Sequence, residues 1–465
     1  MTTLLLIASL AFTAVVGAGS LFAAMRRRAP MQHGRLALIA GTAYPLGALL
    51  MTAWMWLLST VNVSWSRPVV IGPPLLLLAF AAWRWRHRLT ANRGRDVAGA
   101  LAGPTLSGAG RWLWFGLIAW LTLRIAFLAG EILARPPLPW EAWLHAAGRA
   151  HVWHALGGPV AFVPEAAWRN AGGYLEGLPV ASPLTPWLDA WTITAVGAFD
   201  DTTIHAPWLL YWLCLPLLGY ALMRMHGAGP LRSLGMATLI ATLPLPNAHA
   251  ALGGTAALPL AAYYLAAFAF AQRGVRSWVD AALISGMLAG MLASGGIAGA
   301  IWASTLLPLA LSRASATWQS KGTGALVAAA VLAAVVVARD GTGDAATPHA
   351  ASAAALGQHL FLLGNWHLLA YAALAMAVVA WRAWRAPPLL TASGVVALGT
   401  VALLVFTMTA PGRALVGVTV DIGTPAVVFG PLLATWTALV AHRWLERAAD
   451  IGDAPDGKGV EPPRS

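Results

Sequence analysis

Residues 1–28 read MTTLLLIASLAFTAVVGAGSLFAAMRRR, a long apolar run that ends at three consecutive arginines. A helix of about 20 apolar residues is long enough to cross the hydrocarbon core of a bilayer. No basic residue precedes the run, whereas a cleavable signal peptide carries its positive charge before the apolar segment. We therefore expect an uncleaved first span whose N-terminus lies outside, because basic loops stay in the cytoplasm.

The composition of the whole chain agrees with this first segment. Of the 465 residues, 59% are hydrophobic and 10% are charged, whereas about 25% are charged in an ordinary globular domain. Similar apolar runs recur along the chain, which predicts an all-α polytopic membrane protein and excludes a soluble globular one. The net charge of +12 comes mainly from arginines in short loops between these runs. It therefore indicates topology, and we expect the lipid bilayer, not nucleic acid, as a partner.

The apolar runs predict about 13 transmembrane helices. The eighth and ninth are short and meet at Ser294-Gly295-Gly296, which favours a pair of tilted or broken helices or a re-entrant hairpin. The predicted spans lie near residues 2–25, 36–62, 68–83, 112–132, 206–223, 232–248, 255–271, 280–294, 297–311, 323–338, 360–381, 389–410 and 424–441.

The distribution of basic residues tests this span count. With the N-terminus outside, the inner loops hold 20 Arg and Lys residues and the outer loops hold 6. The six outer ones are Arg67, Arg135, Arg149, Arg169, Arg339 and Arg413. A wrong count would have mixed the two sides, so the bias supports an external N-terminus and a cytoplasmic C-terminus. The Ala- and Arg-rich residue usage favours a bacterial source, so we expect the location to be a bacterial inner membrane.

We expect one transmembrane domain over residues 1–441, followed by a disordered cytoplasmic tail at 446–465. Residues 1–110 hold the N-terminal spans and a basic cytoplasmic loop, and residues 206–441 hold the C-terminal spans. Between them, residues 133–205 form a long first external loop, in which a Trp-rich sequence predicts interfacial helices. Tryptophans also stand beside the ends of many apolar runs, as in an aromatic belt: Trp65, Trp112, Trp140, Trp208 and Trp366.

The external loop opens with PPLPWEAWLHAAGRAHVW, residues 136–153. The prolines end the fourth span, and a helix can restart at about Trp140, with Glu141 in its first turn and His145 one turn further on. Glu141 is either a water-exposed acid at a helix start or a carboxylate at the lip of a membrane cavity, where it can act as a base. The histidines lack a third ligand and the spacing of a metalloprotease, so the sequence predicts no metal site and no certain cofactor. A divalent cation stays an open alternative that no motif in the sequence supports.

The stretch PLPWEAWLHAAGRAHVW resembles the first external loop of the GT-C glycosyltransferases, polytopic membrane enzymes that use polyprenyl-phosphate-linked sugars. Three later stretches agree with that family in order: ASPLTPWLDAW at 181–191, followed by Asp200-Asp201; Gly364-Asn365-Trp366-His367; and TAPGR at 409–413. The resemblance covers roughly residues 111–441 and marks the chain as a divergent member, since the usual Asp of the first loop is Glu141 here.

The resemblance implies inverting transfer of a sugar from a polyprenyl-phosphate donor to a lipid or cell-envelope glycan acceptor, on the external side of the membrane. Glu141 would be the catalytic base, and Arg149 and Arg413 would bind the departing phosphate. His145, Trp140, Trp143 and Trp366 are further candidate substrate-binding residues, although the tryptophans equally suit membrane anchoring. Related sequences carry a second acid where this chain has Ala257, so Asp200 or Asp201 is a candidate replacement.

Two other functions remain open from the sequence. The missing acid at Ala257 also fits a GT-C-like scaffold or lipid-binding subunit with weakened catalysis. An amphiphile transporter or flippase would place ionisable residues deep within its spans. Only Arg124 clearly lies in the middle of a predicted span, which disfavours an ion-coupled transporter.

Overall fold

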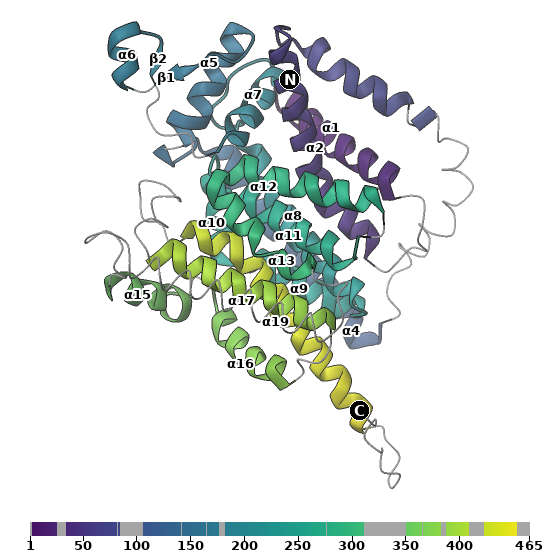
Figure 1. Cartoon of the computed structure of the whole chain (residues 1–465). Coiled ribbons are helices and arrows are strands. Elements are labelled where there is room, and N and C mark those ends of the chain that lie inside the picture. Colours follow the sequence, from purple (N-terminus) through teal and green to yellow (C-terminus); the bar gives the residue numbers. More distant parts are fainter. Residues whose placement is uncertain are drawn as a thin grey trace.

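The computed structural model is a bundle of helices with one small pair of strands in its described part (Figure 1). It describes residues 2–25, 34–80, 82–83, 106–140, 142–163, 165–175, 182–275, 277–310, 350–364, 366–382, 387–408 and 423–452. The predicted span at 323–338 lies outside these residues.

The described elements follow one another along the chain as follows. The first half contains α1 (Thr2–Met25), α2 (Arg35–Thr60), the helix Arg67–Phe80, α4 (Gly108–Ala134), the π-helix η1 (Ala142–Ala147), α5 (Gly148–Leu156), β1 (Phe162–Val163), α6 (Glu165–Ala171), β2 (Tyr174–Leu175), α7 (Leu184–Val196) and α8 (Ala206–Met225). The second half contains α9 (Pro230–Thr242), α10 (Pro244–Leu252), α11 (Ala257–Gln272), α12 (Trp278–Ser304), α13 (Leu307–Ala310), α15 (Ala350–Gly357), the π-helix η4 (Gln358–Leu362), α16 (Leu369–Arg382), α17 (Pro387–Met408) and α19 (Gly423–Gly452). The last helix continues seven residues into the segment predicted as a tail, and residues 453–465 lie outside the described part.

Seven described helices are long and apolar enough to cross a membrane, by length and composition. They lie at Thr2–Phe22, Arg35–Thr60, Gly108–Ala134, Ala206–Met225, Trp278–Ser304, Leu390–Thr407 and Gly423–Ala448. Three shorter apolar helices, Arg67–Phe80, Ala257–Gln272 and Leu369–Arg382, coincide with further predicted spans. The chain is therefore an all-α, multi-pass membrane protein, whereas the predicted count of about 13 spans is not confirmed.

The first two helices pack closely because glycines face each other across their interface. A Cβ atom added at Gly17 would lie 1.8 Å from the carbonyl oxygen of Ala43, and one added at Gly47 would lie 1.8 Å from that of Thr13. Lipid tails are as apolar as side chains, so helices in a bilayer gain contact chiefly by close backbone approach. Small residues at this interface therefore hold α1 against α2.

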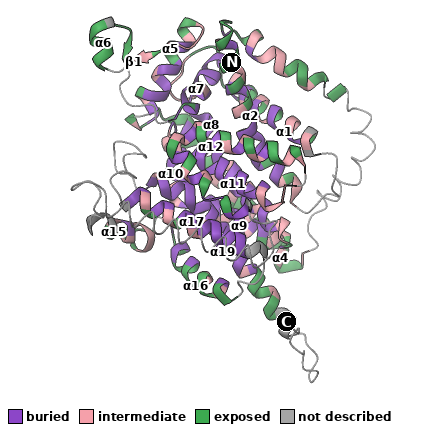
Figure 2. Cartoon of the chain, viewed as in Figure 1, coloured by how far each residue is buried: buried purple, intermediate pink, exposed green. Residues whose placement is uncertain are grey.

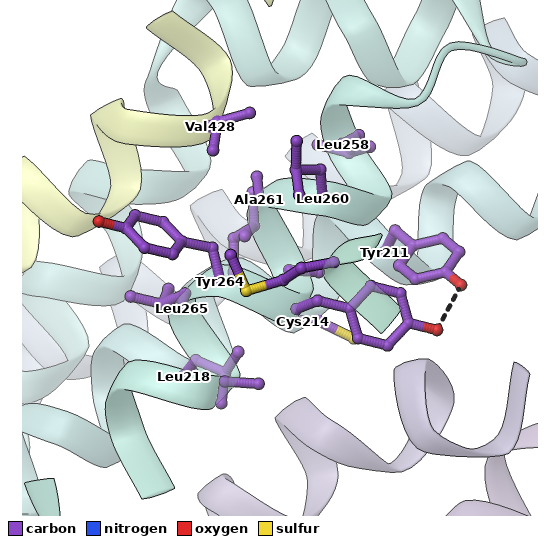
Figure 3. Close-up of a cluster of buried hydrophobic side chains, with 14 of the residues drawn as sticks. Tyr211, Cys214, Leu218, Leu258, Leu260, Ala261, Tyr264, Leu265 and Val428 are labelled. Carbon is purple, nitrogen blue, oxygen red and sulfur yellow. Dashed lines mark hydrogen bonds between the residues drawn. The ribbon is translucent and has the colours of Figure 1, made fainter. Parts of the chain in front are cut away.

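The core of the bundle is centred on α11, which is buried on every side. Residues Ala257–Phe270 are all buried, and α2, α8, α12 and α19 surround them (Figure 2). An apolar sequence on all faces suits such a position, because no face of the helix has to meet water. Figure 3 shows the contact of α11 with α8, where Tyr211, Cys214 and Leu218 lie beside Leu258, Ala261 and Leu265.

Two helices in the apolar region are interrupted. The backbone breaks at Leu243, between α9 and α10, and at Gly296 inside α12, where φ is 53°. Beyond the second break the chain turns back, because a Cβ atom at Gly299 would lie 2.1 Å from the carbonyl oxygen of Met291. The predicted pair of short helices at 280–311 therefore appears as a sharply broken helix. Such breaks survive at membrane depth only where protein groups satisfy the freed backbone.

Protein groups satisfy the break between α9 and α10. The Asn247 side-chain amide donates to the carbonyl oxygens of Ala241, at 2.9 Å, and of Leu243. The imidazole Nε2 of His367 donates to the carbonyl oxygen of Thr242 at 2.8 Å. Three carbonyls at the end of α9 thus find donors from α10 and from the segment before α16.

The segment predicted as an external loop lies at one end of the molecule. Figure 1 shows α5, α6 and the strand pair at the end that holds the N-terminus, and the last turns of α19 at the opposite end. The two ends of the described chain thus lie at opposite ends of the molecule, and which of them faces the outside of a membrane stays a prediction.

Candidate functional site: the segment η1–α5 and its neighbours

The helix predicted after the prolines has an unusual first part. Residues Ala142–Ala147 form a π-helix, and only from Gly148 onward does the chain continue as the α-helix α5. A π-helix changes which side chains share a face, so His145 no longer occupies the α-helical register that the sequence predicts. Short π-helical segments are rare and occur frequently at functional sites.

The inner face of η1 and α5 is buried although the segment follows an exposed turn. His145 and Arg149 are 7% and 8% exposed, whereas Trp140 is 70% exposed. The Arg149 guanidinium lies 4.8 Å from the centre of the Phe162 ring, as in a cation–π contact. The indole N–H of Trp143 donates to the Pro137 carbonyl oxygen at 2.6 Å. Two ionisable side chains therefore point into the protein, while Trp140 faces outward as predicted for an interfacial anchor.

Helix α7 is the support on which η1 and α5 rest. Trp153 of α5, Trp187 of α7 and Trp65 form a cluster in which ring centres lie 5.1–6.4 Å apart. Arg67 closes the end of α7 by donating to the carbonyl oxygens of Thr194 and Val196. Trp65, which the sequence predicted to lie in an aromatic belt, instead packs against Trp153 and Trp187 between α5 and α7.

The segment between α7 and α8 forms a turn that Asp200 organises. The backbone N–H and the hydroxyl of Thr202 donate to one Asp200 carboxylate oxygen at 3.0 and 2.8 Å. Burial by itself would raise the pKa of Asp200, but the hydrogen bonds from Thr202 and Thr203 outweigh it, and the pKa lies below its ordinary value. Asp200 therefore remains a carboxylate whose first task is to hold the turn.

His205 is the residue of this turn that sequence reasoning missed. Its Nε2 lies 3.0 Å from the Asp201 backbone carbonyl, which can only accept, so Nε2 carries the proton and Nδ1 is an acceptor. The ring is 3% exposed, and Nδ1 has no partner among the described residues. Burial lowers the pKa of His205 to about 4, so the ring is neutral. The only signal in the sequence was its place directly before an apolar run.

The connection between α10 and α11 brings these parts together. A Cβ atom at Gly253 would lie 2.7 Å from the His205 side chain, and one at Gly254 would lie 2.2 Å from the Cβ of Ala142. Both glycines have positive φ, at 63° and 72°, which other residues adopt only with strain. Residues 253–254 are thus inserted between the Asp200–His205 turn and the start of η1. Ala257, where the resemblance expects a second acid, follows directly and is buried.

Trp366 belongs to a different neighbourhood. Its ring packs 3.7 Å from the position of a Cβ at Gly430 on α19, and Leu243 at the α9–α10 break lies beside the same glycine. The side chain is 2% exposed and its indole N–H has no partner among the described residues. His367 follows with a positive φ of 51°, a sparsely populated conformation for a residue other than glycine. Trp366 therefore lies at the broken helix, not in an aromatic belt.

Several predicted features lie outside the described residues. Glu141, the candidate base, and Arg413, a candidate phosphate ligand, are both among them, as is Asn365. Within the described ranges no group of three or more His, Cys, Asp or Glu side chains is placed to hold a metal ion.

The described residues of the candidate site are therefore His145 and Arg149 on the buried face of η1 and α5, the Asp200–His205 turn, and the backbone of 253–254 between them. Comparisons of the chain with models of protein families, with curated proteins and with solved structures gave no match.

Proposed function

We propose that the protein is a membrane glycosyltransferase that moves a sugar from a polyprenyl-phosphate-linked donor to a lipid or cell-envelope glycan on the external side. The observation that carries the proposal is the buried, ionisable face of η1 and α5, which packs on α7 directly after the exposed Trp140. A π-helical start, a buried arginine and a neutral histidine acceptor within one neighbourhood suit recognition of a polar, anionic headgroup beside a bilayer.

In the proposed reaction, the acceptor hydroxyl oxygen attacks the anomeric carbon of the sugar. The new C–O bond forms as the bond from that carbon to the phosphate oxygen breaks, which inverts the configuration. Glu141 takes the proton of the acceptor hydroxyl, and polyprenyl phosphate leaves. Arg149 and Arg413 stabilise the charge that develops on the departing phosphate.

In this proposal, the neighbouring Asp200–His205 turn supplies the second carboxylate that Ala257 cannot provide. Gly253 lies against His205, so the Asp200–His205 turn borders the segment where a second acid is expected. Asp200 is engaged with Thr202, which leaves Asp201 as the better candidate to supply a carboxylate. A GT-C-like scaffold that binds lipid without catalysis is the alternative that Ala257 keeps open.

A transporter or flippase for an amphiphile is the second candidate, and the broken helices favour it. Discontinuous helices at α9–α10 and α12 are the kind of backbone from which transporters build substrate sites. Arg124, at mid-span in α4, is the ionisable residue to test in that case.

The test is reconstitution in liposomes with a panel of polyprenyl-phosphate sugars, with wild type compared with Glu141→Gln. Loss of general-base catalysis lowers a rate by about 10²-fold or more, and we expect at least this loss of transfer. Glu165→Gln is the matched control, because Glu165 is an exposed acid of the same predicted external loop that forms an ion pair with the exposed Arg169. Arg149→Lys is compared with Arg169→Lys in the same way, with a rise in donor KM expected only for the first.

Each outcome distinguishes the candidates. Equal transfer by wild type and Glu141→Gln removes Glu141 as the base. Donor binding without transfer by wild type identifies the scaffold. Movement of a fluorescent lipid-linked sugar between leaflets without transfer, lost in Arg124→Gln, identifies the transporter.

A further inference from the structure

Asp189 lies in the segment predicted as an external loop, but the structure buries it inside the bundle. It lies on α7, where twelve of the thirteen residues are buried, and its own exposure is 1%. The Trp191 indole N–H donates to the Thr13 hydroxyl at 3.0 Å, and the Ser182 hydroxyl donates to the Ala293 carbonyl oxygen at 3.4 Å. These contacts hold α7 between α1 and α12, at the level of the middle of α1.

The carboxyl group of Asp189 has no visible partner in this environment. Neither of its oxygens has a hydrogen-bond partner in the described part of the chain. The hydroxyl of Tyr44 on α2 is likewise buried and has no hydrogen-bond partner among the described residues. Buried polar groups in native proteins are nearly always paired, so a carboxyl group with two unpaired oxygens requires an explanation.

The hydroxyl groups of Tyr211 and Tyr263, in the neighbouring tyrosine cluster, are already hydrogen-bonded. The Tyr263 hydroxyl donates to the Pro45 carbonyl oxygen at 2.8 Å, so in its 3.2 Å contact with Tyr211 the latter must be the donor (Figure 3). The Tyr211 ring packs edge-on against Tyr44, with 5.2 Å between ring centres. The hydroxyls of Tyr211 and Tyr263 are therefore both engaged, and neither donates to Asp189.

Among the described residues, no positively charged side chain forms an ion pair with a carboxylate at this place. Burial alone raises the pKa of the Asp189 carboxyl well above its ordinary value, and no charged neighbour contributes. The titratable groups on the described elements packed against α7, and on the segment that closes its end, are Arg35, Tyr44, Arg67, His145, Arg149, His151, His154 and Asp280. None of them donates a hydrogen bond to the Asp189 carboxyl. An isolated buried carboxylate is so costly that the group binds a proton instead.

We propose that Asp189 forms a buried proton-binding site at the junction of α1, α2, α7 and α12, and that it carries the proton at neutral pH. Because η1 and α5 rest on α7, the proton also holds the support of the external segment in place. Release of the proton puts an unpaired charge beneath α7 and loosens that support. The inference does not depend on glycosyl transfer.

The test is infrared difference spectroscopy of the purified full-length protein, with carboxyl-¹³C-labelled aspartate, wild type minus Asp189→Asn. At pH 7 we expect a carboxylic acid C=O band that shifts with the label and is absent from the variant. A carboxylate band in its place would overturn the proposal. If Asp189→Asn does not fold, Asp189→Glu in the same labelled medium decides, because it should lose the acid band that shifts with the aspartate label. Retention of that band in Asp189→Glu would overturn the proposal.

Two further measurements test whether a proton or a metal cation occupies the site, and whether the proton stabilises the fold. Loss of the acid band on addition of sodium chloride at pH 7, but not of choline chloride, would show a metal cation site and contradict a proton site. Thermal stability of wild type should fall as pH rises from 6 to 9 relative to Asp189→Asn. If the melting temperatures of the two proteins changed with pH in parallel, the proposed link between the proton on Asp189 and the packing of α7 would be contradicted.

Discussion

His205 has its imidazole held in one tautomer by a backbone carbonyl, and its second nitrogen is left as a buried acceptor. Such an arrangement is typical of histidines that position a ligand, because the orienting hydrogen bond decides which nitrogen accepts. Asp189 is the contrasting case, since both of its carboxyl oxygens are buried without a donor among the described residues. The two residues therefore respond to pH in opposite directions.

Protonation of His205 is expected to destabilise the protein at acidic pH. The unfolded state takes up a proton near the ordinary pKa of 6.5, whereas the folded state does so only near pH 4. Between these values the unfolded state binds more protons, so stability falls as pH falls, by on the order of 3 kcal/mol over the window. His205→Gln keeps a donor to the Asp201 carbonyl and removes the titration. Its melting temperature, measured in detergent from pH 7 to 4, should fall less than that of wild type, and an equal fall would contradict the assignment.

At the scale of the element, the breaks in α9–α10 and α12 have local causes. Pro244 prevents α9 from continuing, and Gly296 alone of the residues in α12 has a non-helical conformation. The side chains of Asn247 and His367 stabilise the break between α9 and α10, because they donate hydrogen bonds to its free carbonyl oxygens. A broken helix in an apolar environment is thus specified by residues on both sides of the break.

Asn247→Leu should destabilise the protein, because it removes the side-chain donor of the Ala241 carbonyl and leaves the Leu243 carbonyl only a 3.4 Å contact with the backbone N–H of residue 247. The loss of a buried partner costs about 1–3 kcal/mol per group, and we expect a loss of this order in urea or SDS unfolding. Asn170→Leu is the matched control, since Asn170 also donates to a backbone carbonyl but lies on the exposed helix α6. Similar losses in both variants would mean that the amide of Asn247 does not stabilise the break.

At the scale of the whole molecule, the bundle places α5 and α6 at the end that holds the N-terminus and the last turns of α19 at the opposite end (Figure 1). The predicted bias of basic residues assigns the first end to the outside. The single cysteine, Cys214, is buried, which makes the chain suitable for site-directed labelling.

Cysteines at Ala166 and Gly229, introduced singly into Cys214→Ala, should report opposite sides of the membrane. Both positions are exposed, the first on α6 and the second before α9. In intact cells or spheroplasts, a membrane-impermeant maleimide should label Ala166→Cys, and Gly229→Cys only after permeabilisation. The reverse pattern would invert the topology, and labelling of both from outside would contradict the span count between them.

The sequence by itself determined the class of the protein, an all-α membrane protein, and where most apolar helices lie, because apolar runs and Pro or Gly interruptions are local properties. It also located the segment at 136–153 and the break near Gly296. Only the tertiary structure decided which apolar residues meet lipid and which meet protein: Trp112 and Trp140 are exposed, whereas Trp65, Trp208 and Trp366 are buried inside the bundle. The sequence cannot separate these cases, because lipid tails and protein interiors are equally apolar. Helix α7 has 13 residues, too few to span a bilayer, so the sequence predicts it as part of an external loop. The burial of Asp189 depends on α1, α2 and α12, which only the tertiary structure places around it.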